Sequence, residues 1–146
     1  TYTSILEAGR SVKGKTVADS IVAAAREISE TTDIKAIACF TFSGTTASLT
    51  ARERPRVPII ALTANIDTAR RLSLTWGTNC VITGPVDRFK MAVVAAVRAA
   101  VSQGFAEEYD QIAVTAGVPF NQAGTTNILR VAPCEERLIF KSEPDS

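Results

Sequence analysis

The sequence contains no histidine, and this absence excludes several kinds of catalytic site. Without histidine, neither a Ser-His nor a Cys-His catalytic pair can form, and neither can a metal site with histidine ligands. Cysteine is scarce as well: Cys39, Cys80 and Cys134 lie far apart, are odd in number and form no CxxC pair. These cysteines argue against a disulfide framework and are typical of a reducing compartment, so we expect a cytoplasmic location.

An excess of charge of one sign and long apolar runs are also missing. The 16 Lys and Arg residues against 15 Asp and Glu give a formal net charge of +1, so no global basic field recruits nucleic acid or an anionic membrane. The longest strongly apolar run, residues 91–97, ends at Arg98 and is far too short to span a membrane. We therefore expect no nucleic acid and no membrane among the partners. The chain begins at Thr1 rather than at Met, which suggests a piece of a longer protein.

What the 146 residues do contain is an alternation of helical and extended patterns over about one domain's length. The patterns predict helices over residues 16–32, 45–54, 67–74 and 87–103, and buried strands over residues 35–41, 58–62, 79–82, 111–115 and 127–131. The last two strands are joined by a loop too short for a helical crossover, so they should be antiparallel neighbours. The fold class expected is α/β: a three-layer sandwich with a five-stranded, mostly parallel sheet, its last strand antiparallel, and helices on both faces.

Residues at particular helix positions give finer expectations. In the first helix, one apolar stripe should be buried: Val17, Ile21, Val22, Ala25 and Ile28. Asp67 or Thr68 lies near the start of the third helix. Asp87 is a good N-cap for the long fourth helix, which Gly104 should terminate.

The first loop with the composition of a binding site follows the first strand. In α/β folds, ligands bind beyond the carboxyl ends of the parallel strands. A glycine here lets the backbone approach a ligand, hydroxyl groups can donate hydrogen bonds, and the first turn of the next helix favours an anion. These features describe a phosphate pocket without a lysine; the alternative, a helix cap by Ser43 or Thr45, stays open. The residues concerned are Thr41, Phe42, Ser43, Gly44, Thr45 and Thr46.

The second such loop, residues 117–127, joins the last two strands. It is glycine-rich and longer than an ordinary hairpin connection, which favours a functional loop over a simple turn. Arg52, Arg54 and Arg56 cluster around Pro55 and either face water or help to hold an anion. Neither GxxxxGK[ST] nor GxGxxG occurs, and no nucleophile is found with its base.

Two motif-bearing stretches resemble the C-terminal domain of pyruvate kinase. The first carries T-x-S-G-T-T-A at residues 41–47, R-P-x-x-P-I-I-A-L-T at residues 54–63, and T-A-R-x-L at residues 68–72. The second is G-V-P-x-x-x-A-G-T-T-N-x-L-R-V at residues 117–131. The resemblance covers roughly residues 16–131. It divides the chain into a leading segment from a preceding barrel domain (residues 1–15), the α/β domain (16–133) and a tail (134–146).

The resemblance implies a regulatory role for both loops. Residues 41–46 match the family loop that grips the phosphate of an effector. A second loop closes over the effector, and its expected members are Gln122, Ala123, Gly124 and Thr125. By the same resemblance, the domain supplies subunit contacts of a homotetramer and contacts its own barrel domain.

The resemblance also implies what the parent enzyme does. Pyruvate kinase transfers phosphate from phosphoenolpyruvate to ADP in glycolysis, giving pyruvate and ATP, with magnesium and potassium as cofactors. Its catalytic residues lie in a (β/α)₈ barrel and a lid domain, and neither fits in this chain. We therefore expect the chain alone to be inactive, with no catalytic residues, cofactor or metal site of its own.

The identity of the effector stays open, because the sequence departs from the family pattern at the start of the long helix. Members of eukaryotic type that respond to fructose-1,6-bisphosphate carry a tryptophan and an arginine around the start of the long helix, which hold the second phosphate. Residues 84–90 do not match that pattern, with only Arg88 or Lys90 as substitutes. A sugar phosphate or a nucleotide monophosphate is then at least as good a candidate. The alternatives are a stand-alone phosphate-ligand sensor, a structural α/β domain without catalysis, and a small phosphotransferase using Ser43, for which neither a base nor a metal ligand is found nearby.

Overall fold

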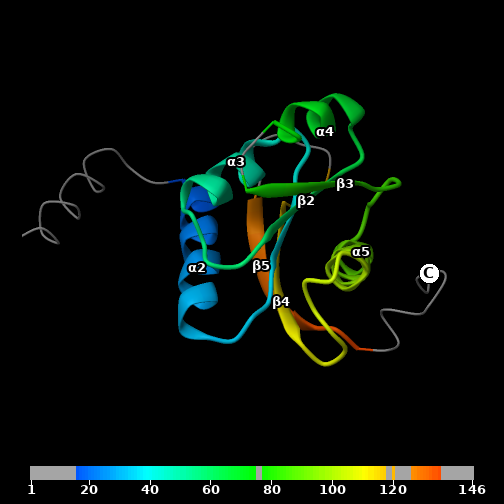
Figure 1. The fold of residues 1–146 in the computed structure, drawn as a ribbon. Helices are drawn as coiled ribbons and strands as arrows, with labels where there is room; N and C mark the ends of the chain where they lie inside the picture. Colours follow the sequence, from blue (N-terminus) through cyan, green and yellow to red (C-terminus); the bar gives the residue numbers. More distant parts are fainter. Residues whose placement is uncertain (1–15, 75–76, 118–119, 121–125, 136–146) are drawn as a thin grey trace, which may run out of the picture.

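A computed structural model describes residues 16–74, 77–117, 120 and 126–135, and the expectations for residues 1–15 and 136–146 lie outside this range. Helices and strands alternate as the sequence predicts (Figure 1). The helices are α2 (Val17–Thr31), α3 (Thr45–Arg52), α4 (Ile66–Leu72) and α5 (Phe89–Ser102). The strands are β1 (Ile37–Phe40), β2 (Ile59–Thr63), β3 (Thr78–Ile82), β4 (Gln111–Gly117) and β5 (Thr126–Pro133).

The strands form one 5-stranded sheet in the order β3-β2-β1-β4-β5. β1 pairs in parallel with β2 and β4, and β2 pairs in parallel with β3. β4 and β5 are antiparallel, which confirms the expectation from their short connection. From β1 the chain moves outward to β3 and then crosses back to β4 on the other side of β1. The strand order therefore reverses between β1 and β4, the position at which α/β sheets form ligand crevices.

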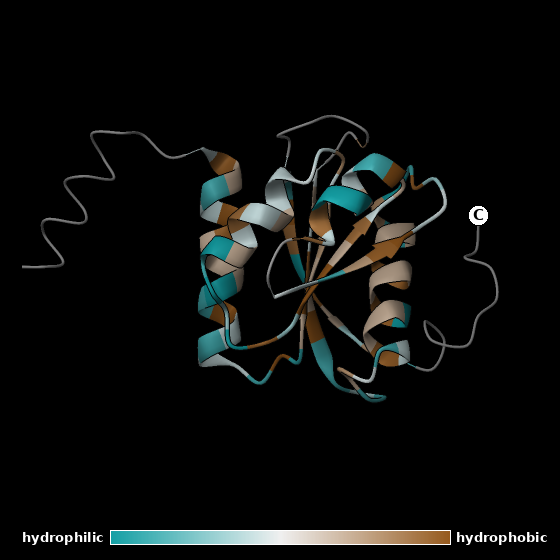
Figure 2. Cartoon of the chain, turned by 45° about the horizontal axis from the view of Figure 1, so that its top comes forward, coloured by the Kyte–Doolittle hydropathy of each residue, from teal (hydrophilic) through white to brown (hydrophobic). Residues whose placement is uncertain are grey.

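Helices cover both faces of the sheet, as predicted, because successive residues of a buried strand point to opposite faces. Ala38 and Phe40 of β1 pack into the cluster built around α5. Ile37 and Cys39 point the other way, into a cluster with Ala25 of α2. On that second face, α3 and α4 add a smaller cluster of their own. Figure 2 shows hydrophobic strands lying between helices whose hydrophilic sides face outward.

Several helix ends differ from the expectations. Of the predicted stripe in α2, Val22 and Ala25 are buried and Ile21 and Ile28 are half-buried, whereas Val17, the first residue of the helix, is 63% exposed. Ala18 and Ser29 are buried instead. Asp87 is not the N-cap of α5: Arg88 occupies that position, and no side chain in the described part of the chain caps it. Gly104 follows the end of α5 with a φ of 79°, as a helix-terminating glycine does.

The helix α4 begins one residue earlier than expected, because Asn65 caps it. The Asn65 side chain accepts hydrogen bonds from the backbone N–H groups of Asp67 at 2.9 Å and Thr68 at 3.2 Å. Asp67 and Thr68 thus lie in the first turn.

Candidate functional site

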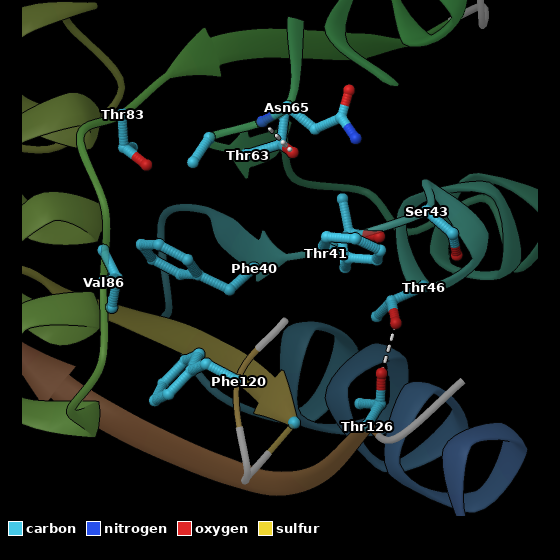
Figure 3. A pocket seen from close by; sticks show the side chains of 13 residues that line it. Phe40, Thr41, Ser43, Thr46, Thr63, Asn65, Thr83, Val86, Phe120 and Thr126 are labelled. Atoms are coloured by element: carbon cyan, nitrogen blue, oxygen red, sulfur yellow. Dashed lines mark hydrogen bonds between the residues drawn. The ribbon is translucent and has the colours of Figure 1, made fainter. Parts of the chain in front are cut away.

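A cavity of about 270 Å³ opens at the carboxyl ends of the strands, where the strand order reverses. The ends of β1, β2 and β4 reach it, together with the segment after β3 and the start of β5 (Figure 3). We call it the main cavity. Its lining residues are Phe40, Thr41, Phe42, Ser43, Thr46, Thr63, Ala64, Asn65, Thr83, Val86, Gly117, Phe120 and Thr126.

Hydrogen bonds between backbone groups and threonine hydroxyls fix the conformation of the loop of residues 41–46. Gly44 occupies the N-cap position of α3 with a φ of 94°, a left-handed conformation that glycine adopts without steric cost. Its N–H donates to the Thr41 hydroxyl at 2.8 Å. The carbonyl of Phe42 accepts a hydrogen bond from the Thr68 hydroxyl of α4 at 2.8 Å. The loop is therefore fixed to its own helix and to the neighbouring one.

The helix-cap alternative for this loop is wrong. Neither Ser43 nor Thr45 caps α3: Gly44 occupies the N-cap position, and no side chain of the described residues forms a cap bond to this helix. Instead, the two hydroxyls hydrogen-bond to each other at 2.9 Å. Both remain near the start of α3, where the unpaired N–H groups of the first turn favour an anion.

Two hydroxyls from distant parts of the chain meet at the edge of the main cavity. Figure 3 shows Thr46 and Thr126 pointing toward each other, and a hydrogen bond joins their oxygens. Both residues are buried. The start of α3 is thereby tied to the start of β5, at the C-terminal end of the range predicted for the second loop.

The main cavity has one polar side and one apolar side. Thr41, Ser43 and Thr46 lie on one side, and Phe40, Val86 and Phe120 lie on the other (Figure 3). All the described residues that line it are uncharged. An anion bound here would be held by hydroxyls, backbone N–H groups and the α3 dipole rather than by an ion pair.

The structure divides the residues predicted for the first loop between two hollows. Thr41, Phe42, Ser43 and Thr46 line the main cavity. Gly44 and Thr45 line a neighbouring hollow between α3 and α4, which Ser43 also reaches. The residues predicted for the closing loop, Gln122, Ala123, Gly124 and Thr125, lie outside the described residues.

Sequence reasoning missed the part of the cavity wall contributed by β2 and β3. Thr63 ends β2, Asn65 follows it, and Thr83 follows β3. The signal was present, since Thr63 and Thr83 each come directly after a short apolar run, residues 58–62 and 80–82, and Asn65 lies two residues beyond Thr63. Using it requires knowing that β2 lies beside β1, which the sequence does not state.

Titratable groups take no part in the main cavity. Cys39 lies in β1, where burial raises the pKa of its thiol despite a hydrogen bond to Thr50. Cys39 is therefore an unreactive residue of the core. No three His, Cys, Asp or Glu side chains of the described residues are grouped so that they could hold a metal ion. Within the same residues, no helix is long and apolar enough to cross a membrane.

Comparison with known proteins gives one consistent result. Residues 19–132 match the family described as "Pyruvate kinase, alpha/beta domain". A pyruvate kinase of Agrobacterium vitis is 43% identical over 130 residues, which are 89% of this chain and 27% of that protein. A pyruvate kinase of Methylorubrum extorquens is 40% identical over 131 residues, which are 90% of this chain and 27% of that protein.

A solved structure shares the fold. The crystal structure of a pyruvate kinase from Cryptosporidium parvum superimposes with a TM-score of 0.75 and 25% sequence identity, over 84% of this chain and 23% of that one. The chain thus spans about a quarter of the length of the proteins that it matches.

Proposed function

The chain belongs to the pyruvate kinase family as its C-terminal α/β domain, and from this premise we propose that it is a regulatory domain that binds a phosphorylated effector in the main cavity. The observation that carries the proposal is the loop of residues 41–46, which leads into the N-terminus of α3 through Gly44 and borders the main cavity. The phosphate would lie against the hydroxyls of Thr41, Ser43 and Thr46. The rest of the effector would extend toward Phe40, Val86 and Phe120.

The cavity favours a ligand with one phosphate group. The hydroxyls of residues 41–46 beside the N-terminus of α3 offer donors for one phosphate, and none of the described lining residues carries a charge that would hold a second one. Arg88 and Lys90, the two substitutes for the missing arginine, do not belong to that lining. The apolar side offers contact to a sugar or base, and Asn65 and Thr63 offer hydrogen-bonding groups. A sugar phosphate or a nucleotide monophosphate therefore fits better than a bisphosphate.

Calorimetric titration of the purified chain with a panel of phosphorylated metabolites tests the proposal. We expect saturable binding of at least one monophosphate. The double variant Thr41→Ala/Ser43→Ala should weaken that binding by about 1–3 kcal/mol through lost hydrogen bonds. Ser102→Ala is the control, because its hydroxyl bonds the Ala99 carbonyl within α5, away from the cavity. If no compound binds, or if the double variant binds as tightly as the parent chain, the cavity is not an effector site.

We further propose that the chain works as part of a longer pyruvate kinase that transfers phosphate from phosphoenolpyruvate to ADP in the cytoplasm. Residues 1–15 would then come from the preceding barrel domain, residues 16–133 would form the regulatory unit, and residues 134–146 its tail. Magnesium and potassium would act in the parent's catalytic domains.

Assembly is the second part of the proposed role. Membership of the family supports contacts with the barrel domain and with other subunits of a homo-oligomer. Two exposed apolar side chains are available for such contacts: Leu74 is 88% exposed and Ile82 is 59% exposed. Isolated apolar residues also occur on monomer surfaces, so self-association has to be measured. Sedimentation of the chain over a range of concentrations tests self-association, and a monomer at every concentration would assign assembly to the rest of the parent.

A further inference from the structure

A second hollow, of about 250 Å³, lies between α3 and α4. We call it the arginine hollow. Its polar lining consists of Ser43, Thr45, Ser48, Arg52 and Arg71. Two guanidinium groups and three hydroxyls thus face one small volume, and no acidic residue is among those that line it. In this respect it is the opposite of the main cavity, whose lining is uncharged.

The geometry of α3 places one arginine over the hollow. Thr45, Ser48 and Arg52 are spaced by three and four residues, so they lie on one face of the helix. Helical side chains lean toward the N-terminus of their helix. Arg52, in the last turn of α3, lines the hollow together with Ser48 and Thr45 from the same face. Within the described part of the chain, Arg52 forms no ion pair.

The second arginine is held in place from α4. The Arg71 Nη2 atom donates hydrogen bonds to the Ser43 carbonyl at 2.9 Å and to the Thr68 hydroxyl at 3.2 Å. These bonds use one nitrogen and leave the other guanidinium N–H groups to act as donors. Arg71 likewise forms no ion pair with any of the described residues. Among the described residues, no carboxylate therefore forms an ion pair that would neutralise the charge of either arginine.

We propose that the arginine hollow is a second anion site, selective for a phosphate group and separate from the main cavity. A guanidinium presents parallel N–H groups that match the oxygens of a phosphate, and two of them balance its double charge. The three hydroxyls supply additional donors. Because Ser43 lines both hollows, a phosphate in the arginine hollow lies against the same loop that faces the main cavity.

The test is a titration of the ¹⁵N-labelled chain with inorganic phosphate at constant ionic strength, followed by NMR. We expect the Nε–H signals of Arg52 and Arg71 and the amide signal of Ser48 to follow one saturating curve. The variant Arg52→Gln/Arg71→Gln should weaken this binding by about tenfold or more, which equals about 1.4 kcal/mol. The matched control Arg54→Gln/Arg56→Gln removes the same charge from exposed arginines outside the hollow and should leave the curve nearly unchanged.

Three results would overturn the proposal: no saturation at these signals, an equal loss in the control variant, or equally strong binding of acetate, which carries one charge. If the double Gln variant loses the folded spectrum, Arg52→Lys/Arg71→Lys replaces it. Lysine keeps the charge but cannot form the bidentate hydrogen bonds of a guanidinium, so phosphate binding should still weaken. The amide signals of Thr63 and Thr126 report on the main cavity separately, so failure here leaves the effector proposal untouched.

Discussion

At the scale of single residues, the polar groups that line the main cavity are mainly hydroxyls, and none of the described lining side chains is charged. Threonine suits this position because its methyl group packs in the core while its oxygen serves the cavity. Thr41 is an example: the residue is 8% exposed, it lines the cavity, and its oxygen accepts a hydrogen bond from the Gly44 N–H. A short run of such residues after a strand can be recognised in the sequence. The partner of Thr46 cannot, because Thr126 lies 80 residues further along the chain.

The cysteines give a prediction about stability and pH. Burial of the Cys134 thiol, together with the negative charge of Asp110, raises its pKa from 9.0 to about 11. The folded state therefore holds this proton more tightly than the unfolded state does. The resulting contribution to the free energy of unfolding is complete below pH 9.0 and is lost as the pH rises to about 11.

The variant Cys134→Ala removes this contribution. Urea unfolding at a series of pH values should show a shallower fall in the free energy of unfolding between pH 9.0 and about 11 than in the parent chain. Other groups that titrate in this window affect both proteins alike, so the difference isolates the thiol. Parallel curves would mean that the Cys134 pKa is not raised.

At the scale of elements, the start of α3 depends on one glycine. A Cβ atom on Gly44 would lie 3.4 Å from Thr68 Cγ2 and 3.5 Å from Leu72 Cδ2, which is ordinary contact. The obstacle is the φ of 94°, which costs other residues roughly 1–2 kcal/mol. We expect Gly44→Ala to lose about that much stability and to weaken effector binding, because the loop must relax.

Gly104→Ala is the matched control for this prediction. Gly104 follows α5 with a φ of 79°, and a Cβ atom added to it would meet nothing within 4 Å. The variant should lose comparable stability in thermal unfolding and bind the effector as the parent chain does. Equal loss of binding in both variants would show that the Gly44 conformation has no particular role in the site.

The elements also show how far the sequence alone leads. Each strand is predictable because a short apolar run such as residues 58–62 is bounded by prolines or polar residues. Helix ends are less predictable: Asp87 has the chemistry of an N-cap, but the chain enters α5 at Arg88. The cavity wall from Thr63 and Thr83 could not be predicted, because it depends on the strand order β3-β2-β1-β4-β5, which is set by packing between segments far apart in the sequence.

At the scale of the whole molecule, the chain has the size of one domain of its longer relatives. We expect the purified chain to transfer no phosphate from phosphoenolpyruvate to ADP, because the proposed function assigns catalysis to other domains of a longer parent. A coupled assay for pyruvate with magnesium and potassium present measures this. Turnover that persists in a preparation free of other enzymes would show that the chain is itself a phosphotransferase.

The central claim is that the loop of residues 41–46 holds the phosphate of an effector. A crystal structure of the chain with the monophosphate that binds most tightly in calorimetry tests it most directly. The account predicts phosphate density in the main cavity, with oxygens within hydrogen-bonding distance of the Thr41, Ser43 and Thr46 hydroxyls and the rest of the ligand beside Phe40 and Phe120. Clear density for the ligand at any other place, with the main cavity filled only by water, would contradict it.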